Sequence, residues 1–259
     1  MLRYDSKLQG TVNALLKDVR YGVAHGSLTR DGYCIAETIH LLEEALRSRC
    51  EIKVVLAAAS AQGAVEARLR RRPEVRVVVL ADALSARVSA TESNQGVMTL
   101  VRPPAWKIED LFRPRPLVVV LDGVQDPGNA GAILRAAEAF GASGVVFRKG
   151  TVNPYNPKVV RASAGSIFRV PLWTEGLDLA ARGMTMYAAT PDEGQAAAQA
   201  DLARDCAIVI GSEGRGVSPE LLAGSTRLHI PTVGVESLNA AMAASILLYE
   251  AARQRGIRS

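Results

Sequence analysis

The sequence predicts an α/β protein of two domains, a smaller one followed by a larger one built on a mainly parallel sheet. The chain has 259 residues, which is enough for two domains of ordinary size. On both sides of a proline-rich segment, short β-branched and apolar runs alternate with segments of helical spacing. Continuous apolar strands separated by helices are typical of parallel sheets that are covered on both faces.

The smaller α/β domain is predicted to span residues 1–102. ETIHLLEEALRS places Ile39, Leu42 and Ala45 at helical spacing, which predicts a helix. The β-branched runs IKVVLAA and VRVVVL predict strands, and the helix-like AVEARLRRR lies between them. NQGVMTLVR predicts one more strand, entered through a glycine turn.

Residues 103–116 are predicted to link the two domains. The surrounding stretch, RPPAWKIEDLFRPRP, carries prolines at 103, 104, 114 and 116 around a short polar piece. Proline removes a backbone donor and fixes φ, so neither a helix nor a central strand passes easily through this stretch.

The larger domain is predicted to span residues 117–259. PLVVVLDG, GVVFR, TMYAAT and AIVIG are strand-like. NAGAILRAAEAFG predicts a helix with Ile133, Leu134 and Ala137 on one side, ended by Gly141. PKVVRASAGSIF predicts a helix over 157–168, and a last helix is expected to start at Ser237.

Composition argues against a bound metal, a disulfide framework and a membrane span. The longest apolar runs are far too short to cross a bilayer, and the N-terminal MLRYDSKLQG lacks the apolar stretch of a signal peptide. We therefore expect a soluble cytoplasmic protein. The few cysteines and histidines are scattered without zinc spacing: Cys34, Cys50, Cys206, His25, His40 and His229.

The positive charge is concentrated in the first part of the chain. Residues 1–115 hold 18 Lys and Arg against 13 Asp and Glu, whereas residues 116–259 hold 13 of each. The densest run, EARLRRRPEVR, could neutralise phosphates and release counterions from RNA. The alternative is a solvated helix end whose arginines favour the negative pole of the helix dipole.

The first of three unusual loops is LDGVQDPGNAGAILRAAEAFGA. Glycine and proline surround Asn129, and a helix carrying Arg135 follows. Such a turn can approach a phosphate, or it can be a tight turn that Asn129 caps. The loop lacks both GxxxxGK[ST] and GxGxxG. Since a buried arginine needs an anionic partner, Arg135 predicts a phosphate or carboxylate beside it, with a structural ion pair left open.

The other two loops also follow predicted strands. AIVIGSEGRGVSPE surrounds Glu213 with three glycines, which indicates an unusual backbone path or close approach to a ligand. LHIPTVGVESLNAAMAAS starts a helix of small residues, where Ser237 and Asn239 could cap the helix or face a site. Because ligands of α/β sheets bind beyond the carboxyl ends of strands, we expect the three loops to converge.

In this order, the three loops resemble the motifs of the SpoU (TrmH-like) branch of the SPOUT superfamily. The matching stretches are DPGNAGAILRAAEAFGA, IVIGSEGRGVS and IPTVGVESLNAAMAA, with NPKVVRASAGSIFRVP between the first two. The resemblance covers about residues 115–255. It implies methyl transfer from S-adenosyl-L-methionine to a ribose 2′-hydroxyl in RNA, with ribosomal RNA favoured over transfer RNA. It also implies a C-terminal trefoil knot in which the third loop threads through the second, and a homodimer formed by that domain.

The resemblance extends to the first domain and to individual residues. ATESNQGVMTLVRPP is similar to the exit of an L30e-like domain, which would bind the substrate RNA. Arg135 is expected to orient the ribose and phosphate, and Asn129 and Asn239 are expected to hold Arg135 or the ribose by hydrogen bonds. Glu213 would anchor the site and accept the proton, and Ser237 would cap the last helix and contact substrate or cofactor. The cofactor is expected at Gly211, Ser212, Gly216, Ile230 and Leu238, and RNA at Arg68, Arg70, Arg71, Arg72 and Arg161.

Other interpretations stay open. The segment 230–237 is one residue shorter than in typical members, and Ala240 stands where valine is usual, so a non-catalytic ribosome-associated RNA-binding protein is an alternative. Methylation of transfer RNA, or of a base, is another. A dehydrogenase is disfavoured because GxGxxG and an acidic residue at the usual spacing are both missing.

Overall fold

The computed structural model describes residues 6–48, 50–90, 95–174 and 176–256. The chain folds into two compact units, each made of two separate segments. Unit 1 comprises Met1–Pro104 and Asn153–Phe168, and unit 2 comprises Ala105–Val152 and Arg169–Ser259. The chain therefore passes between the units three times, whereas the sequence predicted one passage through a linker.

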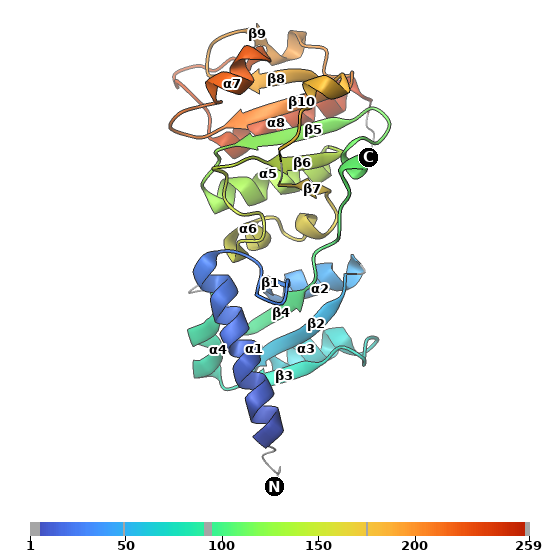
Figure 1. The fold of residues 1–259 in the computed structure, drawn as a ribbon, viewed down its shortest axis with the longest axis vertical. Coiled ribbons are helices and arrows are strands. Elements are labelled where there is room, and N and C mark those ends of the chain that lie inside the picture. The colour runs from blue at the N-terminus through green and yellow to red at the C-terminus, as the bar shows by residue number, and fades with distance from the viewer. Residues whose placement is uncertain (1–5, 49, 91–94, 175, 257–259) are drawn as a thin grey trace. The chain divides into compact units, whose positions relative to one another are not determined.

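Unit 1 is a four-stranded sheet with helices on both faces (Figure 1). Its strand order is β1 (Cys34–Glu37), β4 (Val97–Val101), β2 (Ile52–Ala58) and β3 (Val77–Leu80). β4 runs antiparallel to both neighbours, and β2 and β3 are parallel. The helices are α1 (Ser6–His25), α2 (Ile39–Arg47), α3 (Gln62–Leu69) and α4 (Asp82–Val88), with a short 3-10 turn η1 (Ala59–Ala61).

Alternation along β2 separates the two cores of unit 1. Val54 and Leu56 pack in a cluster with residues of α1 and α4. Val55 and Ala57 pack on the opposite face with residues of α2 and α3. The sequence analysis did not predict α1, because its only apolar stripe lies inside a stretch that is polar overall. That stripe is Val12, Leu15, Leu16, Val19 and Val23.

The segment 153–168 belongs to unit 1, where α6 (Pro157–Ala162) packs against β1. The helix predicted over 157–168 is wrong in length, because it ends at Ala162 and a 3-10 turn η3 (Ser166–Phe168) follows. Ala164 and Gly165 have φ values of 49° and 96°, which interrupt the helix. A Cβ at Gly165 would overlap the side chain of Glu44, so only glycine fits this close approach.

Unit 2 is a seven-stranded sheet whose adjacent strands are all parallel, which confirms the mainly parallel sheet (Figure 1). Helices α5 (Pro127–Ala139) and α8 (Ala240–Gln254) pack together, while short turns and α7 (Pro219–Ala223) complete the unit. The turns are η2 (Ile108–Leu111), η4 (Ala180–Arg182) and η5 (Ala197–Gln199). The strand order is β7 (Leu172–Trp173), β6 (Gly144–Phe147), β5 (Leu117–Asp122), β10 (Cys206–Gly211), β8 (Thr185–Ala189), β11 (Thr226–His229) and β9 (Gln195–Ala196).

The predicted linker contributes to the core of unit 2. Leu111 in η2 is fully buried in a cluster with Val118, Val146 and Val209. Among the described residues, no helix is long and apolar enough to cross a membrane. The same residues contain no group of three or more His, Cys, Asp or Glu side chains that could hold a metal ion.

Arg255 joins the end of α8 to the start of two strands. Its Nε donates to the carbonyl oxygen of Leu202 at 2.8 Å, and its Nη2 donates to that of Pro116 at 3.2 Å. The same guanidinium also donates to the carbonyl oxygens of Arg115 and Arg204. Pro116 precedes β5 and Arg204 precedes β10, so one side chain holds three parts of unit 2 together.

We predict that Arg255→Ala lowers the free energy of unfolding by about 2–3 kcal/mol, because hydrogen bonds made by a charged group contribute roughly 1.5–3 kcal/mol and those to Leu202 and Pro116 are half-buried. Chemical denaturation monitored by circular dichroism measures this change. Arg204→Ala is the matched control: its side chain is 76% exposed and pairs with an exposed Asp201, a kind of pair worth about 0–1 kcal/mol. Equal losses in the two variants would contradict the role of Arg255.

Candidate functional site

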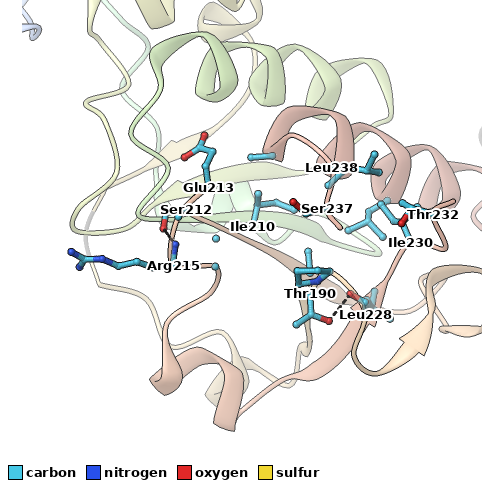
Figure 2. Close-up of a pocket in the computed structure, with 18 residues that line it drawn as sticks. Thr190, Ile210, Ser212, Glu213, Arg215, Leu228, Ile230, Thr232, Ser237 and Leu238 are labelled. Carbon is cyan, nitrogen blue, oxygen red and sulfur yellow. Dashed lines mark hydrogen bonds between the residues drawn. The ribbon is translucent and has the colours of Figure 1, made fainter. Parts of the chain in front are cut away.

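A cavity of about 370 Å³ lies at the carboxyl ends of β10, β8 and β11 (Figure 2). This volume is within the range of about 300–1,000 Å³ usual for small-ligand sites. The three strands are adjacent in the sheet, so their following loops meet at one edge, as parallel strands require. The lining comprises 189–191, 210–216, Leu228, Ile230, Thr232, Ser237, Leu238, Ala240, Ala243 and Leu247.

The loop after β10 folds back onto its own strand end. The N–H of Ser212 donates to the carbonyl oxygen of Gly216 at 3.1 Å, and the N–H of Gly216 donates to that of Ser212 at 2.9 Å. A Cβ at Gly211 would overlap the backbone of Gly216 and Val217. Gly216 also has φ 65°, a conformation that side chains disfavour. The glycines are therefore required by the tight loop, whose tip carries Glu213 and Arg215.

A hydrogen-bonded chain of side chains joins all three predicted loops. Asn129 Nδ2 donates to Glu213 Oε1 at 2.5 Å, and Asn239 Nδ2 donates to Asn129 Oδ1 at 3.0 Å. Figure 2 shows Glu213 pointing towards α5, the helix that carries Asn129, while Arg215 extends away from the other labelled side chains. Because an amide both donates and accepts, asparagine can connect a carboxylate to a second amide.

The helix caps differ from two expectations. The prediction that Ser237 caps the last helix is wrong: α8 starts at Ala240, and Asn239 Oδ1 accepts the N–H groups of Ala241 and Met242 at 2.9 and 3.3 Å. Asn129 does not cap α5 either. Asp126 Oδ1 accepts the N–H of Asn129 at 2.7 Å, which leaves the Asn129 amide available for the other two loops.

Asp122 holds the far end of the loop that follows β10, and the sequence analysis missed it. It is almost fully buried at the end of β5, and its Oδ2 accepts the N–H of Ser218 at 2.7 Å. Arg148 Nε lies 3.5 Å from its Oδ1. A single carboxylate at the end of the apolar run PLVVVL is the signal that could have indicated this residue.

Most predicted site residues lie at or beside the cavity. Glu213 and Ser237 line it, and Asn129 and Asn239 reach it through the hydrogen-bonded chain. Thr190 and Thr232 also line it and were not predicted. The five residues predicted to bind the cofactor all belong to the lining: Gly211, Ser212, Gly216, Ile230 and Leu238.

Arg135 is exposed and lies outside the cavity lining, so the expectation of a buried arginine is wrong. Ile133, Leu134, Ala136 and Ala137 fill the buried side of α5, which leaves Arg135 on the solvent side. Among the described residues no ion pair to its side chain is found. Its guanidinium is thus available to a ligand that arrives from solvent.

The arginines predicted to bind RNA are partly neutralised. Arg68 Nε donates to Glu43 at 3.0 Å. Arg72 forms an ion pair with Glu74, and its hydrogen bond lowers the pKa of that carboxyl. Arg70 and Arg71 are exposed near the end of α3, and Arg161 lies in the last turn of α6.

Comparisons with known proteins agree with one another. The model of the SpoU rRNA Methylase family matches residues 116–249. The chain is 31% identical over 250 residues to the Bacillus subtilis (strain 168) 23S rRNA (guanosine(2553)-2′-O)-methyltransferase RlmP, covering 94% of this chain and 98% of that protein. The structure is similar to the SpoU methyltransferase AviRb from Streptomyces viridochromogenes in complex with AdoMet, with TM-score 0.80, 25% identity and coverages of 93% and 98%. It is also similar to an RNA 2′-O ribose methyltransferase, with TM-score 0.78, 28% identity and coverages of 95% and 98%.

We predict that Asn129→Ala loosens the two loops it connects while leaving the fold intact, because Asp126 still caps α5. Each lost hydrogen bond costs about 1 kcal/mol, so backbone amides of 212–217 and 240–242 should exchange with solvent roughly fivefold faster. Hydrogen exchange followed by mass spectrometry measures this, with Gln125→Ala on the same loop as control. Unchanged exchange in both segments would show that Asn129 does not hold them.

Proposed function

The chain belongs to the SpoU rRNA Methylase family, and on that premise we propose that it transfers a methyl group from S-adenosyl-L-methionine to a ribose 2′-hydroxyl in RNA. The observation that carries the proposal is the chain from Glu213 through Asn129 to Asn239, at the edge of a ligand-sized cavity. Ribosomal RNA is the favoured substrate, because one relative that matches nearly the full length of the chain is named for 23S rRNA.

The cavity suits the cofactor in size and chemistry. Ile210, Leu228 and Ile230 supply apolar walls for a flat heterocycle, and the loop backbone supplies donors and acceptors for polar groups. A Cβ at Gly214 or Gly216 would meet no atom, so this part of the loop leaves space open. When bound, S-adenosyl-L-methionine supplies a methyl group activated by its sulfonium.

The protein's part in the reaction is mainly positioning. A correctly oriented reactant pair can gain about 7–11 kcal/mol over the free reactants. Arg135, which has no internal ion pair among the described residues, would bind the RNA phosphate and orient the ribose beside it. As a hydrogen-bond donor, its guanidinium would also stabilise the developing oxyanion.

Glu213 is the proposed acceptor of the hydroxyl proton. Its Oε1 is held by Asn129, which fixes the carboxylate at the rim of the cavity. A carboxylate has lone pairs enough to accept a second hydrogen bond from a hydroxyl. Ser237, which is exposed in the cavity lining, would contact substrate or cofactor.

The finer architecture follows from the family. We propose that residues 1–102 form an L30e-like RNA-binding domain, and that residues 117–259 form a trefoil knot whose third loop threads through the second. A cytoplasmic location is part of the same proposal.

A homodimer formed through the C-terminal domain is also proposed. Met242, Ile246 and Tyr249 are 56%, 40% and 58% exposed, and their spacing places them on one side of α8. An exposed apolar stripe of this kind is typical of a protein interface. Tyr249 packs edge-on against Phe140, with ring centroids 5.8 Å apart, which would hold it in place for a partner.

We predict that Arg135→Ala lowers methyl transfer to ribosomal RNA about 10²–10³-fold, the loss typical for one donor to a developing oxyanion. Binding of S-adenosyl-L-methionine, measured by calorimetry, should stay unchanged. Tritium transfer gives the rate, and resistance of the product to alkaline cleavage shows methylation of the ribose. Arg204→Ala is the control. Wild-type turnover by Arg135→Ala would remove this residue from the mechanism, and absence of cofactor binding by the wild type would refute the proposed function.

We predict that Met242→Glu combined with Ile246→Glu converts a dimer to monomers, since burying two carboxylates in an apolar interface costs several kcal/mol. Sedimentation velocity measures the change. Met242→Leu combined with Ile246→Val keeps the surface apolar and should leave the dimer intact. A wild-type protein that sediments as a monomer would contradict the proposal.

A further inference from the structure

A second cavity, of about 440 Å³, lies entirely within unit 1. Four basic side chains and two carboxylates contribute to its lining, so the lining has an excess of two positive charges. The basic residues come from separate parts of the chain: α1, the loop after it, β2 and the residue before β3. They are Lys17, Arg30, Lys53 and Arg76, and the carboxylates are Asp18 and Asp31.

Internal contacts hold part of this lining in place. Lys53 Nζ donates to Asp31 Oδ2 at 2.5 Å, which lowers the pKa of that carboxyl, and it lies 4.7 Å from the ring centre of Tyr33. The N–H of Arg30 donates to Asp18 Oδ1 at 2.6 Å, which ties the loop to α1. The Arg30 guanidinium lies 4.6 Å from the ring centre of Tyr21.

The remaining positive charge is not compensated internally. Lys17, Arg30 and Arg76 are exposed, and within the described ranges no ion pair to their side chains is found. Asp18 adds a second signal, because its Oδ2 is buried without a hydrogen-bond partner among the described residues. A buried acceptor of this kind is usually satisfied by an ordered water, which can bridge the carboxylate to a bound ligand. Cations for phosphates next to an acceptor for a hydroxyl match the groups that a ribose-phosphate backbone presents.

We propose that this cavity, rather than the arginine run 68–72, holds the RNA backbone on unit 1. This inference rests on the proposed function, since it places part of the RNA substrate away from the methyl-transfer site. Arg30 and Arg76 bind phosphates, Lys17 extends the positive field along α1, and Asp18 accepts from a ribose hydroxyl through a bridging water. The run 68–72 has the same excess of two positive charges, because Glu43 and Glu74 pair with two of its four arginines. The cavity differs from it in being hollowed and in holding the unpartnered Asp18 Oδ2.

The test compares two variants of equal net charge. The cavity variant combines Lys17→Gln, Arg30→Gln and Arg76→Gln, and the control combines Arg70→Gln, Arg71→Gln and Arg87→Gln, all exposed positions of unit 1. Affinity for a fluorescently labelled RNA hairpin is measured by anisotropy over a range of salt concentrations. Since each phosphate contact contributes about 0.7–0.9 to the slope of log K against log salt, the loss of the Arg30 and Arg76 contacts should lower this slope by about 1.4–1.8. Its affinity should fall at least tenfold below the control.

Equal affinities of the two variants would overturn the proposal, and so would equal competition by polyglutamate, which would indicate a site for any polyanion. Thermal unfolding of both variants, together with single Lys17→Gln and Arg30→Gln variants, verifies that the fold is retained. Binding of S-adenosyl-L-methionine should be the same in all variants. If the wild-type protein binds RNA through the cavity but transfers no methyl group, the proposed function fails while this site stands.

Discussion

The candidate site depends on one asparagine amide that makes two hydrogen bonds of opposite sense. Asn129 donates to Glu213 and accepts from Asn239, residues that lie 84 and 110 positions further along the chain. Neither aspartate nor alanine could do both, because one lacks the donor and the other lacks both groups. The catalytic proposal for Glu213 relies on this amide, because Glu213 sits at the tip of a loop that is otherwise exposed.

The parallel sheet brings the Asn129 amide within hydrogen-bond distance of Glu213. β5 and β10 are parallel neighbours in register from Leu117 opposite Cys206 to Asp122 opposite Gly211, so the two following loops leave the same edge at the same height. Asp122 then fixes the far end of the second loop, and Asn239 fixes the start of α8. Asp122 at the end of β5 and Asn129 in the first turn of α5 thus hold the second loop without entering the cavity lining.

The sequence predicted the elements whose signals are local. The β-branched runs of both sheets and the apolar faces of α2 and α5 stand where periodicity placed them. Features decided by distant partners could not be predicted. Gly165 lies where Glu44 approaches the backbone closely, Arg68 and Arg72 pair with Glu43 and Glu74, and Arg135 faces solvent because its neighbours fill the buried side.

Because the chain passes between the two units three times, the role of each unit cannot be tested simply by deleting the other. The segment 153–168 leaves unit 2, packs α6 against β1 of unit 1, and returns. Val159, Val160, Ile167 and Phe168 are at most 2% exposed, and removal of residues 1–104 would take away the sheet against which this segment packs. Exposing four large apolar side chains costs about 1.5–3 kcal/mol each. A truncated protein would therefore bind RNA less well both because it is less stable and because it lacks an RNA surface. The contribution of unit 1 to RNA binding has to be measured with charge substitutions in the full-length chain.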